Sequence, residues 1–570
     1  MILFTTSTIV EIDSENAAAI VSSSSSIQQN EKLKTFQNSF CGMNTLPNST
    51  EYVTEYVLPQ NCEMPLGIGV DIKEDRVWYV STKKGILGSY DIEEDKFNEE
   101  MQIPTWPSRN NDREFSQVWD VEIDNQDNAN GDVWFTDGKQ NAIWRYITST
   151  NSFERYTLPG QSQDFGTTYP SSIEFNPNND SIVYFVGMFS PSIWMAEIDR
   201  LKNETSEGIS EIPIPIEGFE ETDPVFVTTG SLAFDEKESA LWVSVMIYGY
   251  KGQIFRYNLD NKSFDAFDLP SDLSSPWGLT VDDNSNLWVT NAGTSIFYKL
   301  NPENNNHDDN NDGKSTQDFE IEKFVTSKGS FRIFGKFPES DTERNFQNRY
   351  YTLPSMVKVS DDGLVWFNEQ HGNKISKFDP STEILTEYWV PTQNRLWGVC
   401  SNDDISNNNS SIKNNDICGI ANVLQFSIEK DDKQIWFSEW SQNKIGKVDA
   451  AEDPPFSIDV FESDKELTIE RGEKEKIKLS IKSDSDSTSS ALKNDMRLVA
   501  SGTFTSSGDI GNSTGYFEQL SPISMEEGEE QEVSFEFTPS TDLESGDYTL
   551  MIGAENNSIS YLRAVKIKII

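Results

Sequence analysis

The sequence predicts an all-β protein, in which a seven-bladed β-propeller is followed by an immunoglobulin-like β-sandwich. A tryptophan-centred unit recurs along the 570-residue chain, each copy contains four short alternating strands, and the unit disappears after residue 455. Four strands in a compact unit of about 45 residues are typical of a propeller blade. The seven copies centre on Trp78, Trp134, Tyr184, Trp242, Trp288, Trp366 and Trp436.

The fifth copy shows the unit most clearly. It predicts a strand over 276–281, an acidic turn over 282–284, the tryptophan strand over 286–290 and a third strand over 295–300. Because the tryptophan strand is the most apolar, we expect it to be buried on both faces. A pair of β-sandwiches is the alternative arrangement, but it would not explain seven copies.

The ring is expected to close through its N-terminal strand. The seventh copy lacks a final strand ending in proline, whereas residues 54–59 precede the first copy and match 386–391 of the sixth. The N-terminal strand should therefore complete the last blade, which removes the open edges. The propeller is predicted to span residues 51–452.

Both flanks differ from the repeat. Residues 456–570 contain longer alternating strands and predict the immunoglobulin-like sandwich. Residues 1–50 predict a disordered segment with a low-complexity Ser22–Ser26 linker. Its apolar start is interpreted either as a clipped signal peptide or as a disordered tail, because no Lys or Arg precedes Lys32.

Composition restricts the partners. The chain has 46 Lys and Arg against 94 Asp and Glu, a net charge of −48, which argues against binding nucleic acid or an anionic membrane. No apolar run is long enough for a transmembrane helix. With two histidines, sites built on several His ligands are excluded. The sequence does not predict an oligomeric state.

Four cysteines form two sequence-local pairs, Cys41 with Cys62 and Cys400 with Cys418. We predict a disulfide within each pair. A bridge that closes a polar loop of the second size contributes about 3 kcal/mol in the chain-entropy model. Disulfides favour an extracellular or cell-surface protein, although four thiols could also be ordinary core residues.

Two short motifs recur in the propeller. Val-Trp-Phe-Thr-Asp at 133–137, Val-Trp-Phe-Asn-Glu at 365–369 and Ile-Trp-Phe-Ser-Glu at 435–439 share one pattern, and Asn-Lys-Ile-Gly-Lys follows at 443–447. These motifs resemble those of the streptogramin (virginiamycin B) lyase family. The resemblance implies a metal-assisted C–O elimination that opens an ester-closed cyclic peptide, with a histidine base and Mg²⁺ held by carboxylates.

The chain departs from that family at the chemical positions. Trp397 stands where the resemblance implies the catalytic histidine, and Arg395 where it implies a glutamate. Ser355 stands where the resemblance implies a substrate-contacting histidine. Glu439 is the acid nearest to an implied metal-ligand position. The base that the family uses is therefore absent.

One end of the channel collects the remaining candidates. The loops leading into the inner strands and the loops after the tryptophan strands should open on the same face. They bring Trp119, Trp277 and Trp397 together with Ser355 and Arg395 as candidate contacts for a small molecule, peptide or glycan. The alternative is that the tryptophans are core residues or channel plugs.

Acidic residues supply the remaining candidates. Glu369 and His371 could form an acid–base pair or ligate a metal, or could lie in a solvated turn. Asp308, Asn310 and Asp312 fit the start of a Ca²⁺ loop. Phe319 stands where the loop needs its final glutamate, so a solvated acidic insertion is the alternative.

Two functions stay open at this level. The first is a secreted or cell-surface binding module that lacks the catalytic histidine. The second is a lyase whose base has moved to His371, with Mg²⁺ or Ca²⁺ as cofactor. The sequence does not decide whether the protein is an enzyme.

Overall fold

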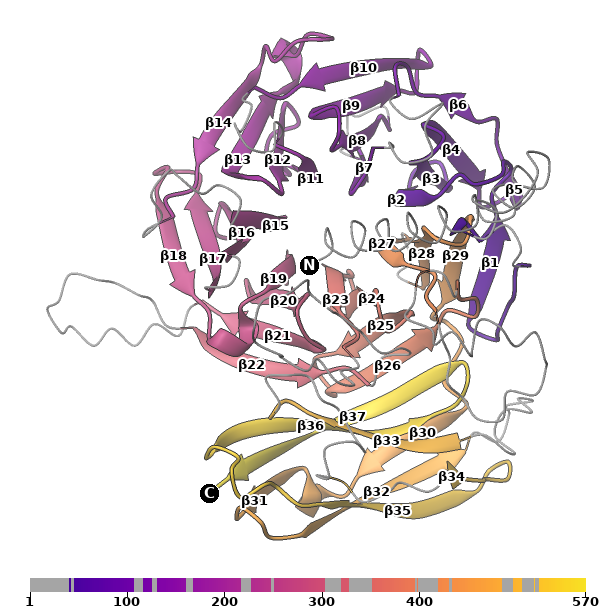
Figure 1. Cartoon of the computed structure of the whole chain (residues 1–570), viewed down its shortest axis with the longest axis vertical. Coiled ribbons are helices and arrows are strands. Elements are labelled where there is room, and N and C mark those ends of the chain that lie inside the picture. Colours follow the sequence, from indigo (N-terminus) through magenta and orange to yellow (C-terminus); the bar gives the residue numbers. More distant parts are fainter. Residues whose placement is uncertain are drawn as a thin grey trace, which may run out of the picture.

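The all-β class and the propeller are confirmed (Figure 1). The computed structural model describes residues 40–42, 46–106, 116–125, 131–159, 168–216, 227–247, 251–302, 319–327, 351–394, 397, 419–429, 433–483, 496–504, 517 and 522–570. Short 3₁₀ turns lie at Ile198–Arg200, Ser271–Leu273 and Glu462–Asp464. No helix within these ranges is long and apolar enough to span a membrane.

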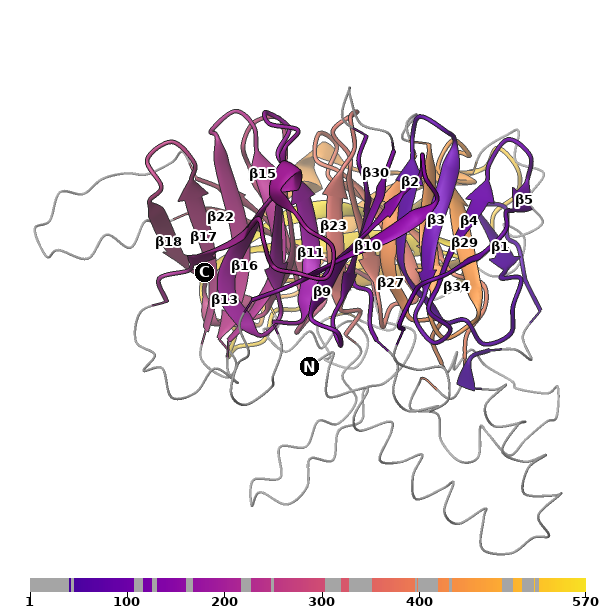
Figure 2. The same ribbon diagram turned by 90° about the horizontal axis from the view of Figure 1, so that it is seen from above.

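Seven antiparallel blades surround the channel, and in blades 1 to 6 the chain runs from the inner to the outer strand (Figures 1 and 2). Blade 1 contains β2 (Pro65–Asp71), β3 (Arg76–Ser81), β4 (Ile86–Asp91), β5 (Lys96–Phe97) and β6 (Met101–Gln102). Blade 2 contains β7 (Val121–Ile123), β8 (Val133–Asp137), β9 (Ala142–Ile147) and β10 (Ser152–Thr157). Blade 3 contains β11 (Pro170–Phe175), β12 (Ile182–Gly187), β13 (Ser190–Glu197) and β14 (Ile209–Pro213).

Blades 4 to 7 repeat the arrangement. Blade 4 contains β15 (Val227–Asp235), β16 (Ala240–Ile247), β17 (Lys251–Asn258) and β18 (Phe264–Asp268), and blade 5 contains β19 (Pro276–Val281), β20 (Leu287–Asn291), β21 (Ile296–Asn301) and β22 (Glu320–Val325). Blade 6 contains β23 (Pro354–Val359), β24 (Val365–Glu369), β25 (Lys374–Asp379) and β26 (Ile384–Trp389). Blade 7 contains β27 (Val423–Ile428), β28 (Gln434–Glu439), β29 (Lys444–Asp449) and β1 (Val53–Val57).

The second strand of each blade forms its core, as the apolar tryptophan strand predicts. Trp134, Trp242, Trp288, Trp366 and Trp436 are each under 2% exposed. Each of these indoles is paired in register with an Arg or Lys of the third strand. That cation lies over the ring, at 5.2 Å for Arg145 and Trp134 and 5.7 Å for Lys447 and Trp436. The Arg or Lys of the repeat thus covers the indole of its own blade.

The ring closes through β1, which pairs antiparallel with β29 from Val53 opposite Val448 to Val57 opposite Lys444. The last blade is therefore built from both ends of the propeller sequence. This pairing covers an edge that would otherwise expose unpaired backbone groups.

The C-terminal residues form two packed sheets. One contains β30 (Phe456–Val460), β32 (Glu475–Ser483) and β35 (Glu530–Phe537), and the other contains β31 (Glu466–Ile469), β33 (Met496–Gly502), β34 (Pro522–Ile523), β36 (Gly546–Glu555) and β37 (Ile559–Ile569). Ile477 and Phe535 of the first sheet join Ile552 and Val565 of the second in one apolar cluster. The immunoglobulin-like assignment and the domain boundaries stay predictions.

The second of these sheets is continuous with blade 6. Strand β37 pairs antiparallel with β26, from Ile384 opposite Arg563 to Tyr388 opposite Ile559, so that nine strands belong to one sheet. Figure 1 shows β37 lying along β26 at the edge of the ring. The C-terminal sheets (residues 456–570) are thus bonded to the propeller backbone, which no sequence pattern indicates.

Strand β1 offers a matched test of ring closure. Val53 is fully buried, whereas Val57 on the same strand is 41% exposed. Val53→Ala should lower the free energy of unfolding by about 1–3 kcal/mol because it leaves a cavity, and Val57→Ala by about 0.5 kcal/mol or less. Denaturant unfolding followed by tryptophan fluorescence measures both. Equal effects would contradict a closing role for β1.

Candidate binding site at the channel mouth

One end of the channel is filled by apolar side chains. The start of each inner strand lies opposite the end of the second strand, as in Pro276 opposite Asn291 and Pro354 opposite Glu369. The loops at both positions therefore meet at the same end. We call the resulting cluster the mouth cluster; it comprises Cys41, Cys62, Met64, Leu66, Trp119, Met188, Trp277, Ala292, Trp397, Ile420, Leu424 and Trp440.

The three predicted ligand-binding tryptophans all belong to the mouth cluster. Trp119, Trp277 and Trp397 are 4%, 6% and 6% exposed. The rings of Trp119 and Trp277 meet edge to face with centroids 6.4 Å apart. The structure therefore brings these side chains together, but in a packed arrangement.

An N-terminal strap, residues 40–42, lies on this cluster. The Phe40 ring packs on Trp397 with centroids 4.6 Å apart, and Trp397 packs on Trp440 at 4.8 Å. The carbonyl oxygen of Phe40 accepts hydrogen bonds from Trp397 Nε1 at 2.6 Å and Asn394 Nδ2 at 3.1 Å. The strap thus occupies the mouth through both its side chain and its backbone.

A disulfide and a glycine hold the strap in place. Cys41 and Cys62 form the disulfide that the sequence predicts, with Cα atoms 5.2 Å apart. Gly42 has φ +69°, and a Cβ there would lie 2.5 Å from the Cα of Gln442. Both the backbone conformation and the close approach require glycine.

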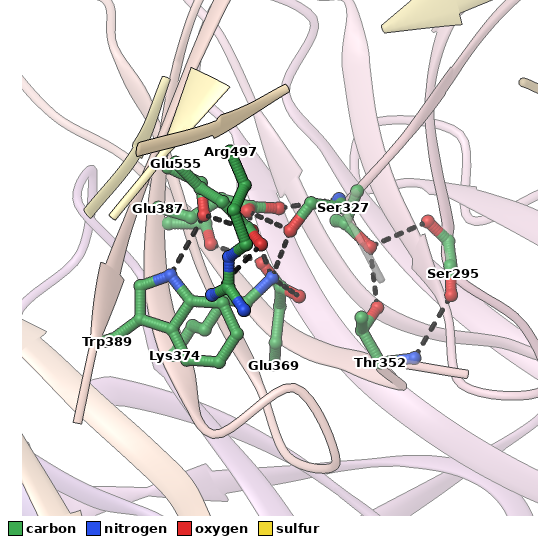
Figure 3. Close-up of polar contacts among 12 residues, drawn as sticks. Ser295, Ser327, Thr352, Glu369, Lys374, Glu387, Trp389, Arg497 and Glu555 are labelled. Carbon is green, nitrogen blue, oxygen red and sulfur yellow. Dashed lines mark hydrogen bonds and ion pairs between the residues drawn. The ribbon is translucent and has the colours of Figure 1, made fainter. Parts of the chain in front are cut away.

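Glu369 belongs to a buried Glu–Lys–Glu triad in blade 6 (Figure 3). Lys374 Nζ lies 2.9 Å from Glu387 Oε2 and 3.6 Å from Glu369 Oε2, and all three side chains are fully buried. Burial raises the pKa of Glu369 to about 8, although the charge of Lys374 opposes the shift. Glu369 is therefore part of a structural ion network.

The same network reaches the C-terminal sheets. The Trp389 indole donates to Ser560 Oγ at 2.8 Å and lies 4.7 Å from Lys374 Nζ. Arg497 and Glu555 form an ion pair at 3.3 Å beside it. Figure 3 shows these side chains converging from blade 6 and from the C-terminal sheets. The triad therefore lies at the junction of the two parts.

Glu439 belongs to the equivalent triad in blade 7. Lys444 Nζ lies 2.8 Å from Glu55 Oε2, and Thr392 Oγ1 donates to Glu439 Oε2 at 3.2 Å. Burial and the charge of Glu55 raise the pKa of Glu439 well above its usual range. Because Lys444 supplies a fixed positive charge, this site does not fit the Mg²⁺ that the resemblance implies.

His371 is 3% exposed and lies in the turn after β24, where its backbone N–H donates to Thr352 O at 2.9 Å. Burial lowers the pKa of His371 to about 3, because the cation would lose its hydration. Burial thus favours the neutral imidazole and weakens it as a proton acceptor. This environment does not favour the general-base role.

Ser355 is buried at the start of blade 6, where its carbonyl oxygen accepts from Thr290 Oγ1. Its hydroxyl has no hydrogen-bond partner within the described ranges. Arg395, Asp308, Asn310, Asp312, Cys400 and Cys418 lie outside those ranges, as do residues 1–39. The binding and Ca²⁺-loop assignments and the second disulfide at those positions stay predictions.

Further along the inner strands, side chains of blades 6 and 2 meet. Lys358 of blade 6 forms an ion pair with Glu122 of blade 2 at 3.0 Å. Asp120 Oδ2 accepts from the backbone N–H of Ile173 at 2.8 Å. Burial raises the pKa of Asp120 to about 7 and that of Glu174 to about 8. The lumen therefore holds three carboxyl groups around one lysine.

Across all the described residues, no group of three or more His, Cys, Asp or Glu side chains could hold a metal ion.

Several important residues were not predicted. Asn373 and Asn443, with φ of 57° and 55°, immediately precede the third strands of blades 6 and 7. Asn373 Oδ1 accepts from Ala421 N of the next blade at 2.7 Å, and Asn443 Oδ1 from Glu63 N at 2.6 Å. The recurring Asn-Lys pair was the available signal: its asparagine fastens the next blade and its lysine completes the triad. No such signal marked Phe40.

We compared the chain with known families, curated proteins and solved structures. No known protein family matches the sequence, and no curated protein is similar to it. Among solved structures, virginiamycin B lyase from Staphylococcus aureus is 20% identical, with 70% of this chain and 98% of that chain covered and a TM-score of 0.45. A streptogramin B lyase is 18% identical, with coverages of 70% and 97% and a TM-score of 0.46. Hydrazine synthase from Kuenenia stuttgartiensis is 9% identical, with coverages of 70% and 98% and a TM-score of 0.44.

The blade 6 triad can be tested with two lysines of one strand. Lys374→Met leaves two buried carboxyl groups without their cation and should lower the free energy of unfolding by about 3–5 kcal/mol. Lys377→Met removes a charge that lies 5.7 Å from the Trp366 ring, and should change stability by about 1 kcal/mol or less. Chemical denaturation at neutral pH compares them. A tolerated Lys374→Met would show that the triad does not stabilise the fold.

Stability should fall as pH rises. The pKa is raised to about 8 in Glu174 and to about 7 in Asp120, chiefly by burial. These groups stay protonated in the folded state to a higher pH than in the unfolded chain. Their stabilisation is therefore complete below about pH 4.5 and is lost as pH rises through about 7 to 8. His371 has the opposite effect, because its pKa is lowered to about 3 in the folded state. Below the usual pKa of histidine the unfolded chain binds a proton that the folded protein does not, so this residue lowers stability as pH falls.

Thermal unfolding at about pH 5.5 and about pH 8.5 measures this balance, and the melting temperature should be higher at the acidic value. Glu174→Gln should weaken the dependence, whereas the exposed Glu99→Gln should leave it unchanged. A melting temperature that rises with pH would contradict the assignment.

Proposed function

We propose that this protein is a non-catalytic, secreted or cell-surface binding module whose channel mouth recognises a peptide with an aromatic side chain. The observation that carries the proposal is the strap. Phe40 packs on Trp397 while its carbonyl oxygen accepts two side-chain hydrogen bonds. The mouth thus already holds a peptide segment, and that segment belongs to the same chain.

The chemistry of the mouth supports a peptide over other ligands. Indole rings offer large apolar contacts at little conformational cost. Trp397 Nε1 and Asn394 Nδ2 are donors that match a backbone carbonyl. The disulfide between Cys41 and Cys62 fits an oxidising compartment.

The lyase alternative has weaker support. Its candidate base, His371, is buried and has its pKa lowered to about 3. Glu369, its candidate acid, and Glu439, its candidate metal ligand, each lie beside a buried lysine. A general base must reach the proton that it abstracts, which buried groups of this kind do not favour.

A chain without its strap tests the proposal. We would delete residues 1–45 and replace Cys62 by Ser, so that no unpaired thiol remains at the mouth. A blocked peptide of residues 36–44 with Cys41→Ser should bind one to one by titration calorimetry. The same peptide with Phe40→Ala should bind at least about tenfold more weakly, because a buried aromatic contact is lost.

Trp397→Phe in the truncated protein is the matched control on the receptor side. It keeps an aromatic ring but removes the indole donor, so affinity should fall by about two- to tenfold, equivalent to one hydrogen bond. Circular dichroism confirms that each variant is folded. A folded, strap-free protein that shows no saturable peptide binding would overturn the proposal.

A further inference from the structure

Blade 1 differs from the other six at its outer edge. Its outer strand is split into β5 and β6, each of two residues, whereas the outer strands of the other blades are continuous runs of five or six. Glu100 lies in the break between β5 and β6. There its carboxylate meets the loop that connects β1 to β2, where the ring closes.

That loop presents a buried carboxylate. Glu63 is fully buried and is held by its backbone: its N–H donates to Asn443 Oδ1 at 2.6 Å and its carbonyl accepts from Ser81 Oγ at 2.8 Å. Its Oε1 accepts from the backbone N–H of Gln60 at 2.7 Å. Its Oε2 has no hydrogen-bond partner within the described ranges.

Glu63 and Glu100 share Gln60 as a hydrogen-bond partner, and their side chains are in contact. Gln60 Nε2 donates to Glu100 Oε2 at 2.7 Å, and Tyr79 OH donates to Glu100 Oε1 at 3.2 Å. The charge of Glu100 and its direct contact add to burial in raising the pKa of Glu63 to about 8. Neither carboxylate has an ion-pair partner among the residues that the structure describes.

The triads of blades 6 and 7 show how this chain stabilises two buried glutamates. In both, a lysine ammonium lies beside the pair, as Lys444 lies beside Glu55 and Glu439. At Glu63 and Glu100 no such ammonium is present in the described part of the chain. Two facing carboxylates, one with an unpartnered and fully buried oxygen, need a proton or a cation between them.

We propose that a divalent cation, Ca²⁺ in preference to Mg²⁺, binds between Glu63 and Glu100. The side chains that contact the two carboxylates, Gln60 and Tyr79 at Glu100 and Ser81 at Glu63, offer oxygen atoms and an amide, which suit a hard cation. The Gln60 side chain supplies a third ligand when its amide turns to present Oε1, since the two amide orientations are interchangeable. Gln60 is exposed, so water can complete a shell of six to eight ligands, as Ca²⁺ accepts and Mg²⁺ rarely does.

The site would tie two weak points together. Gln60 and Glu63 flank Cys62, whose disulfide holds the strap, and Glu100 belongs to the broken outer strand of blade 1. The cation would thus link the loop at ring closure to the edge of blade 1. With two carboxylates, the dissociation constant should lie at about 10⁻⁴–10⁻³ M, the range of extracellular Ca²⁺ modules.

Calorimetric titration of the chelator-treated full chain with CaCl₂, and thermal unfolding with CaCl₂ against NaCl of equal ionic strength, test the site. The parent protein should show saturable binding and a higher melting temperature in CaCl₂. Glu100→Gln, at a partly exposed position that should tolerate the change, and Glu63→Gln should each weaken this binding at least about tenfold.

Two controls separate this site from other carboxylates. Glu439→Gln removes an equally buried glutamate that has a lysine beside it, and should leave Ca²⁺ affinity unchanged. Asp308→Asn with Asp312→Asn removes two carboxylates of the predicted Ca²⁺ loop and should leave Ca²⁺ binding between Glu63 and Glu100 intact. If Glu63→Gln and Glu100→Gln bind Ca²⁺ as the parent does, or the parent shows no saturable binding to about 10 mM, the pair holds a proton and the proposal fails.

Discussion

The closed ring depends on a buried ion pair at the seam between the two ends of the propeller. Lys444 of β29 and Glu55 of β1 lie 2.8 Å apart with both side chains fully buried. Two charges removed from water are favourable only when each keeps a partner, so this contact requires β1 to be in place. Leu46 and Thr392 add further acceptors for the lysine. Closure therefore joins the N-terminal segment, blade 6 and blade 7 in one network.

The same logic recurs in blade 6, where it extends beyond the propeller. Lys374 lies beside Glu387 on β26, the strand that also pairs with β37 of the C-terminal sheets. Propeller blades normally leave a short outer edge exposed, and here a second set of sheets covers one of them. Apolar residues of blade 7 and of the C-terminal sheets also share one cluster. The propeller and the C-terminal sheets are therefore joined by a shared β-sheet and a shared apolar cluster.

These contacts give the residues of the family-like motifs a structural role. The Trp-Phe-x-Glu and Asn-Lys-Ile segments resemble an enzyme family, yet in this chain their residues brace the blades. The glutamate and lysine form the triad, and the asparagine receives a backbone N–H of the following blade. A motif that recurs in several blades is under the same packing constraints each time, which suits scaffold better than chemistry. Chemistry would need residues that occur once.

The sequence by itself determined the propeller, its closing strand and the pairing of Cys41 with Cys62. All three follow from local signals: a repeating apolar period, a displaced outer strand and the short spacing between two cysteines. The burial of Trp119, Trp277 and His371, the fit of Phe40 on Trp397 and the meeting of Glu63 with Glu100 were decided by the tertiary structure. Each depends on how far apart in space two distant segments come to lie, and on how completely water is excluded between them. Neither quantity is encoded in residue type or local spacing.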